Sequence, residues 1–196
     1  IGHPNGLLVE HVTVSGVSFL LENKGQQGQG LQAMVAMDRC RDATLERCLL
    51  HAQVLNEVAG VVVSRSTDVR VTNCVVDNVQ YGLWTLADMA GLVIVGNSFD
   101  AANKRQSDGG LVALLLQDLS FPARIEDNRL LGFVFGIVLN NGALTGTPFS
   151  LAAGSTISGN YIVRLGAEVD PGTLKAFGID VAADGCVISD NILLYN

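Results

Sequence analysis

Five aspartates are the first candidates for chemistry in this chain. They lie in or just after short apolar runs that begin near a glycine, and they are Asp38, Asp88, Asp118, Asp180 and Asp184. If these runs stack on one another, the carboxylates form a column at one corner, where they could hold calcium or act as general acids. The alternative is a turn role, because an Asp side chain bonds the backbone two residues further along.

A second candidate surface is apolar. Five runs open with Gly and then alternate, at residues 60–63, 82–86, 110–114, 136–139 and 178–181. If Leu83, Leu111, Ile137 and Ile179 point into a core, strand alternation sends the intervening residues outward. The resulting outward strip is predicted to contain Val62, Trp84, Leu86, Val112, Leu114 and Val138.

Exposed apolar strips of this extent usually mark an interface. We therefore expect the strip to be covered by another subunit, by an absent domain or by one of the chain's own inserts. A further alternative is that Trp84, the only Trp of the chain, forms a platform on which a sugar stacks.

A sequence pattern that repeats along the chain predicts the strands that position these residues. The pattern I-x-[GD]-N-x-[LIF] occurs in four places, and three earlier segments keep the frame with another residue in the Asn slot. The four residues in that slot are Asn97, Asn128, Asn160 and Asn191. Repetition at a near-constant period indicates a solenoid, and the apolar spacing of two with frequent β-branched residues excludes helices. We predict an all-β, single-stranded solenoid of about seven coils, in one domain over residues 1–196.

The repeated Asn has a structural interpretation. A side-chain amide has donors and an acceptor, so identical Asn residues one strand apart can bond one another and the turn backbone.

Cys48 and Cys74 occupy the same slot in two successive repeats and should lie about 4.8 Å apart. That spacing is compatible with a disulfide, and two buried free thiols are the alternative. No C-x-x-C or nearby His pair is present, so no metal site is predicted.

Charge and hydropathy limit the partners. The chain has 12 basic and 19 acidic residues and a net charge of -7, which argues against a nucleic-acid or anionic-membrane surface. No stretch approaches the roughly 20 uninterrupted apolar residues that a membrane helix needs. The first and last repeats end without a cap, so we expect either a fragment of a longer protein or a partner that covers the ends.

The repeated frame resembles the right-handed parallel β-helix of the pectin-lyase-like superfamily, including its NosD-like and carbohydrate-binding repeat members. The resemblance extends over essentially the whole chain, and the turn asparagines that form a ladder in that family match the four Asn residues above. It implies a polysaccharide as partner, with calcium as cofactor if the chain is a lyase.

The superfamily's catalytic signatures are absent from this sequence. There is no Asn-Thr-Asp or Asp-Asp pair with a following Gly-His-Gly, no Arg-x-Pro-x-x-Arg and no Asp-Pro-His-Glu. The first hypothesis is therefore a non-catalytic scaffold module of an extracellular or cell-surface protein, without a cofactor, that binds carbohydrate or self-associates through its Gly-strand face. The alternative is a polysaccharide lyase, hydrolase or epimerase that uses some of the five aspartates.

Overall fold

The structure is a computed structural model, and it describes residues 8–22, 32–53, 58–101, 111–140, 153–164, 177–183 and 185–195. Every regular element in these residues is a β-strand, and neighbouring strands in each sheet are parallel. No helix that could cross a bilayer occurs in them. The prediction of an all-β chain with stacked parallel strands is confirmed.

The strands form three sheets, and the chain visits the sheets in turn. The first contains β1 (Val9–Ser15), β4 (Cys40–Glu46), β7 (Arg70–Thr72), β10 (Val93–Val95), β13 (Arg124–Glu126), β16 (Thr156–Ser158) and β19 (Val187–Ser189). The second contains β2 (Ser18–Leu21), β5 (Leu49–Ala52), β8 (Val75–Asp77), β11 (Ser98–Asp100), β14 (Arg129–Leu131), β17 (Tyr161–Arg164) and β20 (Ile192–Tyr195). The third contains β3 (Gln32–Asp38), β6 (Val58–Ser64), β9 (Tyr81–Thr85), β12 (Val112–Gln117), β15 (Phe135–Asn140) and β18 (Phe177–Val181).

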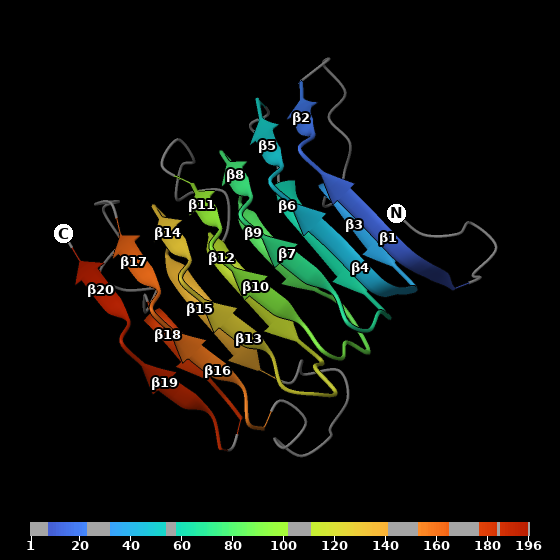
Figure 1. The fold of residues 1–196 in the computed structure, drawn as a ribbon. Helices are drawn as coiled ribbons and strands as arrows, with labels where there is room; N and C mark the ends of the chain where they lie inside the picture. The colour runs from blue at the N-terminus through green and yellow to red at the C-terminus, as the bar shows by residue number, and fades with distance from the viewer. Residues whose placement is uncertain are drawn as a thin grey trace.

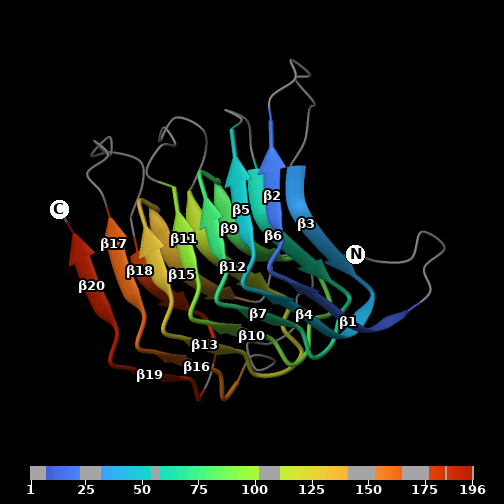
Figure 2. The same cartoon turned by 45° about the horizontal axis from the view of Figure 1, so that its top comes forward.

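We call one strand from each sheet, taken in chain order, a rung. Each sheet runs from the blue to the red end of the molecule, so that successive rungs stack (Figure 1). Figure 2 shows the second sheet in front of the third, with the first sheet below both. The side chains that point inward from all three sheets make one core.

The first sheet shows why the repeated aliphatic residue is needed. Val71, Ile94, Ile125 and Ile157 pair in register from rung to rung, and each is fully buried. Burial of each such side chain contributes roughly 1.5–3 kcal/mol. Two residues further along, the chain turns from the first sheet into the second with a positive φ in every rung, at Gly16, Arg47, Asn73, Gly96, Asp127, Gly159 and Asp190. Gly, Asn and Asp are the residues that tolerate this conformation, and Arg47 is the exception.

The third sheet differs from the prediction in its register. Leu114 pairs with Leu83 and Ile137, and its side chain is fully buried in the core. The prediction that Leu114 points outward is therefore wrong. Val112 pairs with Tyr81 and Phe135, and not with Trp84 and Val138 as predicted.

The cause of the shift is a column of small residues. A Cβ added to Gly82 would lie 2.4 Å from the Ala113 carbonyl oxygen and 2.6 Å from Phe99 Cδ1. One added to Gly136 would lie 2.3 Å from the Gly178 carbonyl oxygen. The space at Gly82 and Gly136 excludes a larger side chain, and Ala113 fills the paired position in the rung between them. The outward row that includes Trp84 therefore consists of Ala36, Val62, Trp84, Leu115, Val138 and Asp180.

Candidate functional site

The predicted carboxylates lie in two kinds of position. Asp88 and Asp118 are turn residues with φ of 43° and 53°, respectively. Asp38 ends β3 and pairs with Ser64, whereas Asp180 lies in β18 beside Val138, in a different row. The structure does not bring Asp38 and Asp180 together. Asp184 lies outside the described residues.

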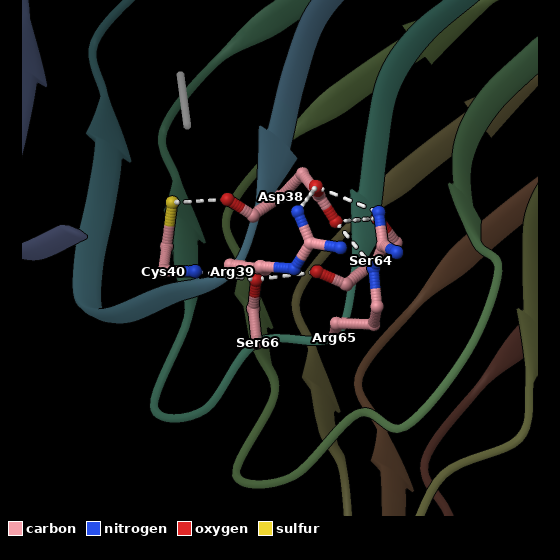
Figure 3. A network of polar contacts seen from close by, with 6 residues as sticks. All are labelled: Asp38, Arg39, Cys40, Ser64, Arg65 and Ser66. Atoms are coloured by element: carbon pink, nitrogen blue, oxygen red, sulfur yellow. Dashed lines mark hydrogen bonds and ion pairs between the residues drawn. The ribbon is translucent and has the colours of Figure 1, made fainter. Parts of the chain in front are cut away.

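Asp38 is held by a network of polar contacts, which Figure 3 shows from close by. Its carboxylate accepts a hydrogen bond of 2.6 Å from Ser64 Oγ. Arg65 donates to both of its oxygens, from Nε at 2.8 Å and from Nη2 at 2.7 Å. Arg39 Nη1 lies 3.5 Å away. The carboxylate is therefore bound on both oxygens by cations, in the arrangement that favours its ionised form.

This environment sets the pKa of Asp38. Burial raises the pKa, but the hydrogen bonds from Ser64 and Arg65 and the positive charges of Arg65 and Arg39 outweigh burial and hold it below its ordinary value. A general acid needs a pKa near the working pH, so Asp38 is poorly suited to that role.

The same network also fixes the turn from the third sheet to the first. Ser66 Oγ donates to the Ser64 carbonyl oxygen at 2.7 Å and accepts from the Cys40 N–H at 3.0 Å, which links two consecutive rungs. Arg39 and Arg65 both have positive φ in this turn. The contacts drawn in Figure 3 are those of a corner that holds neighbouring rungs in register.

Two His–Asp pairs lie on the outer faces of the sheets. His11 Nδ1 is 2.9 Å from Asp42 Oδ2, and His51 Nδ1 is 2.7 Å from Asp77 Oδ2. The other oxygen of Asp42 accepts from Arg70 at 2.6 Å. Each pair joins neighbouring strands. Among the described residues, no group of three or more His, Cys, Asp or Glu side chains could hold a metal ion.

An aromatic pair stands on the outer face of the third sheet. The rings of Tyr81 and Trp84 are stacked, with centroids 5.0 Å apart and planes inclined by 30°. Leu83 and Thr85 on either side of Trp84 are fully buried, which places Trp84 on the outer face. Tyr81 shares that face, because the small-residue column at Gly82 interrupts the alternation of the strand.

Polar groups lie beside the pair. Trp84 Nε1 donates to Gln117 Oε1 at 3.0 Å. Gln117 is held in place because its N–H donates to Thr85 Oγ1 and its carbonyl oxygen accepts from the same hydroxyl, both at 2.7 Å. Asn140 is the next residue of this row, and its side-chain oxygen is buried without a hydrogen-bond partner. The arrangement combines flat aromatic surface with adjacent amide groups.

The predicted apolar strip is largely covered. Val62, Val112 and Val138 are exposed by only 8%, 7% and 8%, while Leu86 is 42% exposed. Trp84 is half-buried. The sequence had singled out Trp84 but missed Tyr81 and Gln117, because they join the site only through the register of the third sheet.

Comparison of the chain with protein-family models, with curated proteins and with solved structures gives no match.

Proposed function

We propose that this chain is a non-catalytic scaffold whose third sheet binds carbohydrate at the Tyr81–Trp84 pair. The stacked rings beside Gln117 carry the proposal. Aromatic rings offer a flat apolar surface with a polar edge, and binding sites combine such surface with a few polar groups that fix the orientation of the ligand. A sugar ring has matching chemistry, with apolar C–H faces and hydroxyls around its edge.

The neighbouring amide of Gln117 supplies the polar part of the site. Gln117 Oε1 is engaged by Trp84, which leaves the amide N–H groups of Gln117 to donate to a sugar hydroxyl. The side-chain oxygen of Asn140, in the same row, is buried and takes no part in the site. An uncharged donor beside aromatic rings suits a neutral glycan.

Self-association through this face has less support. An interface between copies needs a continuous exposed apolar patch, and the valines of the strip are almost completely covered. The non-catalytic role rests on the missing signature motifs, and Asp38 agrees with it because its contacts with Arg65 and Arg39 favour the ionised form.

We also propose the finer form of the fold: a right-handed parallel β-helix of about seven coils, of the pectin-lyase-like superfamily, in a protein of the cell surface or extracellular space. The repeated sequence frame and the ladder of Asn97, Asn128, Asn160 and Asn191 support it.

The test is a fluorescence titration. Trp84 is the only Trp of the chain, so its emission reports this site directly. Neutral and uronic-acid oligosaccharides are titrated separately. We expect a saturable change with a neutral glycan, and Gln117→Ala should weaken binding about tenfold, as loss of one hydrogen bond to ligand does.

Phe121→Ala is the control, because Phe121 is an aromatic residue, 61% exposed, in the segment between β12 and β13 and outside the stacked pair. It should bind as the parent does. Absence of binding to any glycan, or equal affinity of the Gln117 and Phe121 variants, would overturn the proposal. A stable oligomer in light scattering that Trp84→Asp dissociates would assign the face to self-association instead, and calcium-dependent turnover of a uronic-acid polymer would indicate a lyase.

A further inference from the structure

Two cysteines occupy ladder positions in the second and third rungs. The Cys74 N–H donates to Asn97 Oδ1 at 2.9 Å, which is the contact that Asn97 N makes with Asn128 at 3.0 Å. The Cys74 thiol lies 3.6 Å from the Leu45 carbonyl oxygen, where Asn97 Nδ2 contacts Val71 O at 2.8 Å. The Cys48 thiol contacts the Val14 carbonyl oxygen in the same way at 3.6 Å. The thiols therefore occupy the place of the amides.

Cys48 and Cys74 face each other across adjacent rungs. The residues on either side pair in register, Glu46 with Thr72 and Leu49 with Val75, and the Val75 N–H donates to the Cys48 carbonyl oxygen at 2.9 Å. In-register residues of neighbouring strands are about 4.8 Å apart. A disulfide spans Cα separations of roughly 4.4–6.8 Å. The backbone and side chain of Cys48 also reach the Cys74 thiol.

Burial separates this pair from solvent. Cys48 is 2% and Cys74 1% exposed. Burial raises the pKa of the Cys74 thiol to about 11. Because the thiolate is the reactive form, the buried Cys74 thiol reacts slowly in the folded chain. The pair is accessible only before the third rung has packed on the second.

We propose that Cys48 and Cys74 form a disulfide between consecutive rungs when the chain folds in the presence of a small disulfide such as oxidised glutathione. One protein thiolate attacks the glutathione disulfide, and a mixed disulfide forms while one glutathione leaves. The second protein thiolate then displaces the other glutathione. The protein loses two protons and two electrons, and the glutathione disulfide is reduced to two thiols. Once formed, the bond lies in the core and is shielded from reductants.

The experiment compares three samples of the full chain: refolded from urea in oxidised glutathione, refolded in reductant, and folded first and then exposed to oxidised glutathione. Thiols are counted with Ellman's reagent after denaturation, and linked peptides are identified by mass spectrometry. We expect the first sample to lose two of its four thiols, in a peptide that joins Cys48 to Cys74. The third sample should keep its thiols far longer than the first.

Variants separate this bond from random oxidation. Cys40→Ala/Cys186→Ala leaves the ladder unchanged and should form the same linked peptide, whereas Cys48→Ala should leave Cys74 as a thiol. The oxidised protein should unfold at a higher temperature than the reduced one. Four thiols in the correctly refolded first sample, or linked peptides that contain Cys40 or Cys186 in place of the pair, would overturn the proposal.

Discussion

Asn128 shows at the scale of a single residue how the rungs are joined. Its side-chain nitrogen donates to the Ile94 carbonyl oxygen at 2.9 Å and to Asn160 Oδ1 at 3.0 Å. Its side-chain oxygen accepts from the backbone and side-chain nitrogens of Asn97, both at 3.0 Å. The residue is 1% exposed. One buried side chain thus connects three rungs and satisfies two backbone groups of one of them, the Ile94 carbonyl oxygen and the Asn97 N–H.

Asn128→Ala should lower the free energy of unfolding by about 3 kcal/mol, because several buried groups lose their partners at once and each costs about 1–3 kcal/mol. Urea denaturation measures the change. Arg129→Ala, at the exposed residue that follows, is the control and should change stability by less than about 0.5 kcal/mol. Equal effects of the two variants would contradict the role of the ladder.

Cys74→Asn should extend the ladder by one rung. The amide is a stronger donor than a thiol, so it should bond the Leu45 carbonyl oxygen better than the Cys74 thiol does. It should also donate to Asn97 Oδ1, which already accepts from the backbone N–H of residue 74. We expect a gain of about 1 kcal/mol in the free energy of unfolding, measured in reductant so that no disulfide contributes. A loss of stability would show that the third rung has no room for the amide.

Asp38 makes stability sensitive to acid. Its pKa in the folded chain lies below the ordinary value of 3.8, so its ion pairs stabilise the fold above that pH and are lost as the pH falls through the lower, folded value. The side chain is 33% exposed, which screens the interaction. Asp38→Asn should therefore make the fall in unfolding free energy between about pH 5 and pH 2 shallower. Urea denaturation at several pH values checks this, and an unchanged slope would argue against it.

At the scale of the element, the sequence predicted the first two sheets more accurately than the third. The repeated aliphatic residue and the Asn slot are a few residues apart with no insertion between them, so their register follows directly from the pattern. The third sheet follows inserts of variable length, and Gly110 was taken as the equivalent of Gly82. The structure places Ala113 there instead, because the position requires only a small side chain.

The candidate site lies on the third sheet, so only part of it could be predicted from the sequence. Trp84 could be recognised from sequence as an outward aromatic residue, since strand alternation from Leu83 suffices. Tyr81 and Gln117 could not, because their contacts with Trp84 depend on an interrupted alternation and on pairing between strands distant in sequence. The role of Asp38 depended in the same way on Arg65, which lies one rung away.

Gly136→Ala tests the small-residue column. The added methyl would lie 2.3 Å from the Gly178 carbonyl oxygen and 2.9 Å from Ile162 Cγ2, so β15 and β18 must separate, at a cost of about 3 kcal/mol. Gly16→Ala is the comparison. Gly16 has φ +66° and no heavy atom within 4 Å, so only the conformational cost of about 1 kcal/mol applies. If the Gly16 variant were the less stable of the two in urea, close packing at the small-residue column would not be what makes Gly136 necessary.

At the scale of the whole molecule, the core is closed in the middle and open at its last rung. Ile188 and Leu193 are 51% and 39% exposed, although the residues that precede them in their columns, Ile157 and Ile162, are 0% and 7% exposed. At the other end, Val14 and Phe19 are only partly buried. Each rung is therefore stabilised by both neighbours except at the two ends.

Hydrogen exchange should follow this gradient. Amides of β7, β10 and β13 pair on both sides and should exchange most slowly, whereas those of β1 and β19 should exchange fastest among the strands of the first sheet. Exchange followed by mass spectrometry of peptides gives the profile. Uniform protection from β1 to β19 would indicate that the stack opens only as a whole.

The parallel stacking also determines how the molecule responds to force. The hydrogen bonds between rungs run along the axis of the stack, and β1 and β20 lie at opposite ends of it (Figure 1). A pull on the two ends of the chain therefore loads these bonds along their own direction and breaks them one rung at a time. Asn97 and Asn128 are 31 residues apart, so each rung released there lengthens the chain by about 100 Å, at roughly 3.3–3.6 Å per residue. Under tension, the protein should lengthen in a series of steps rather than break at once.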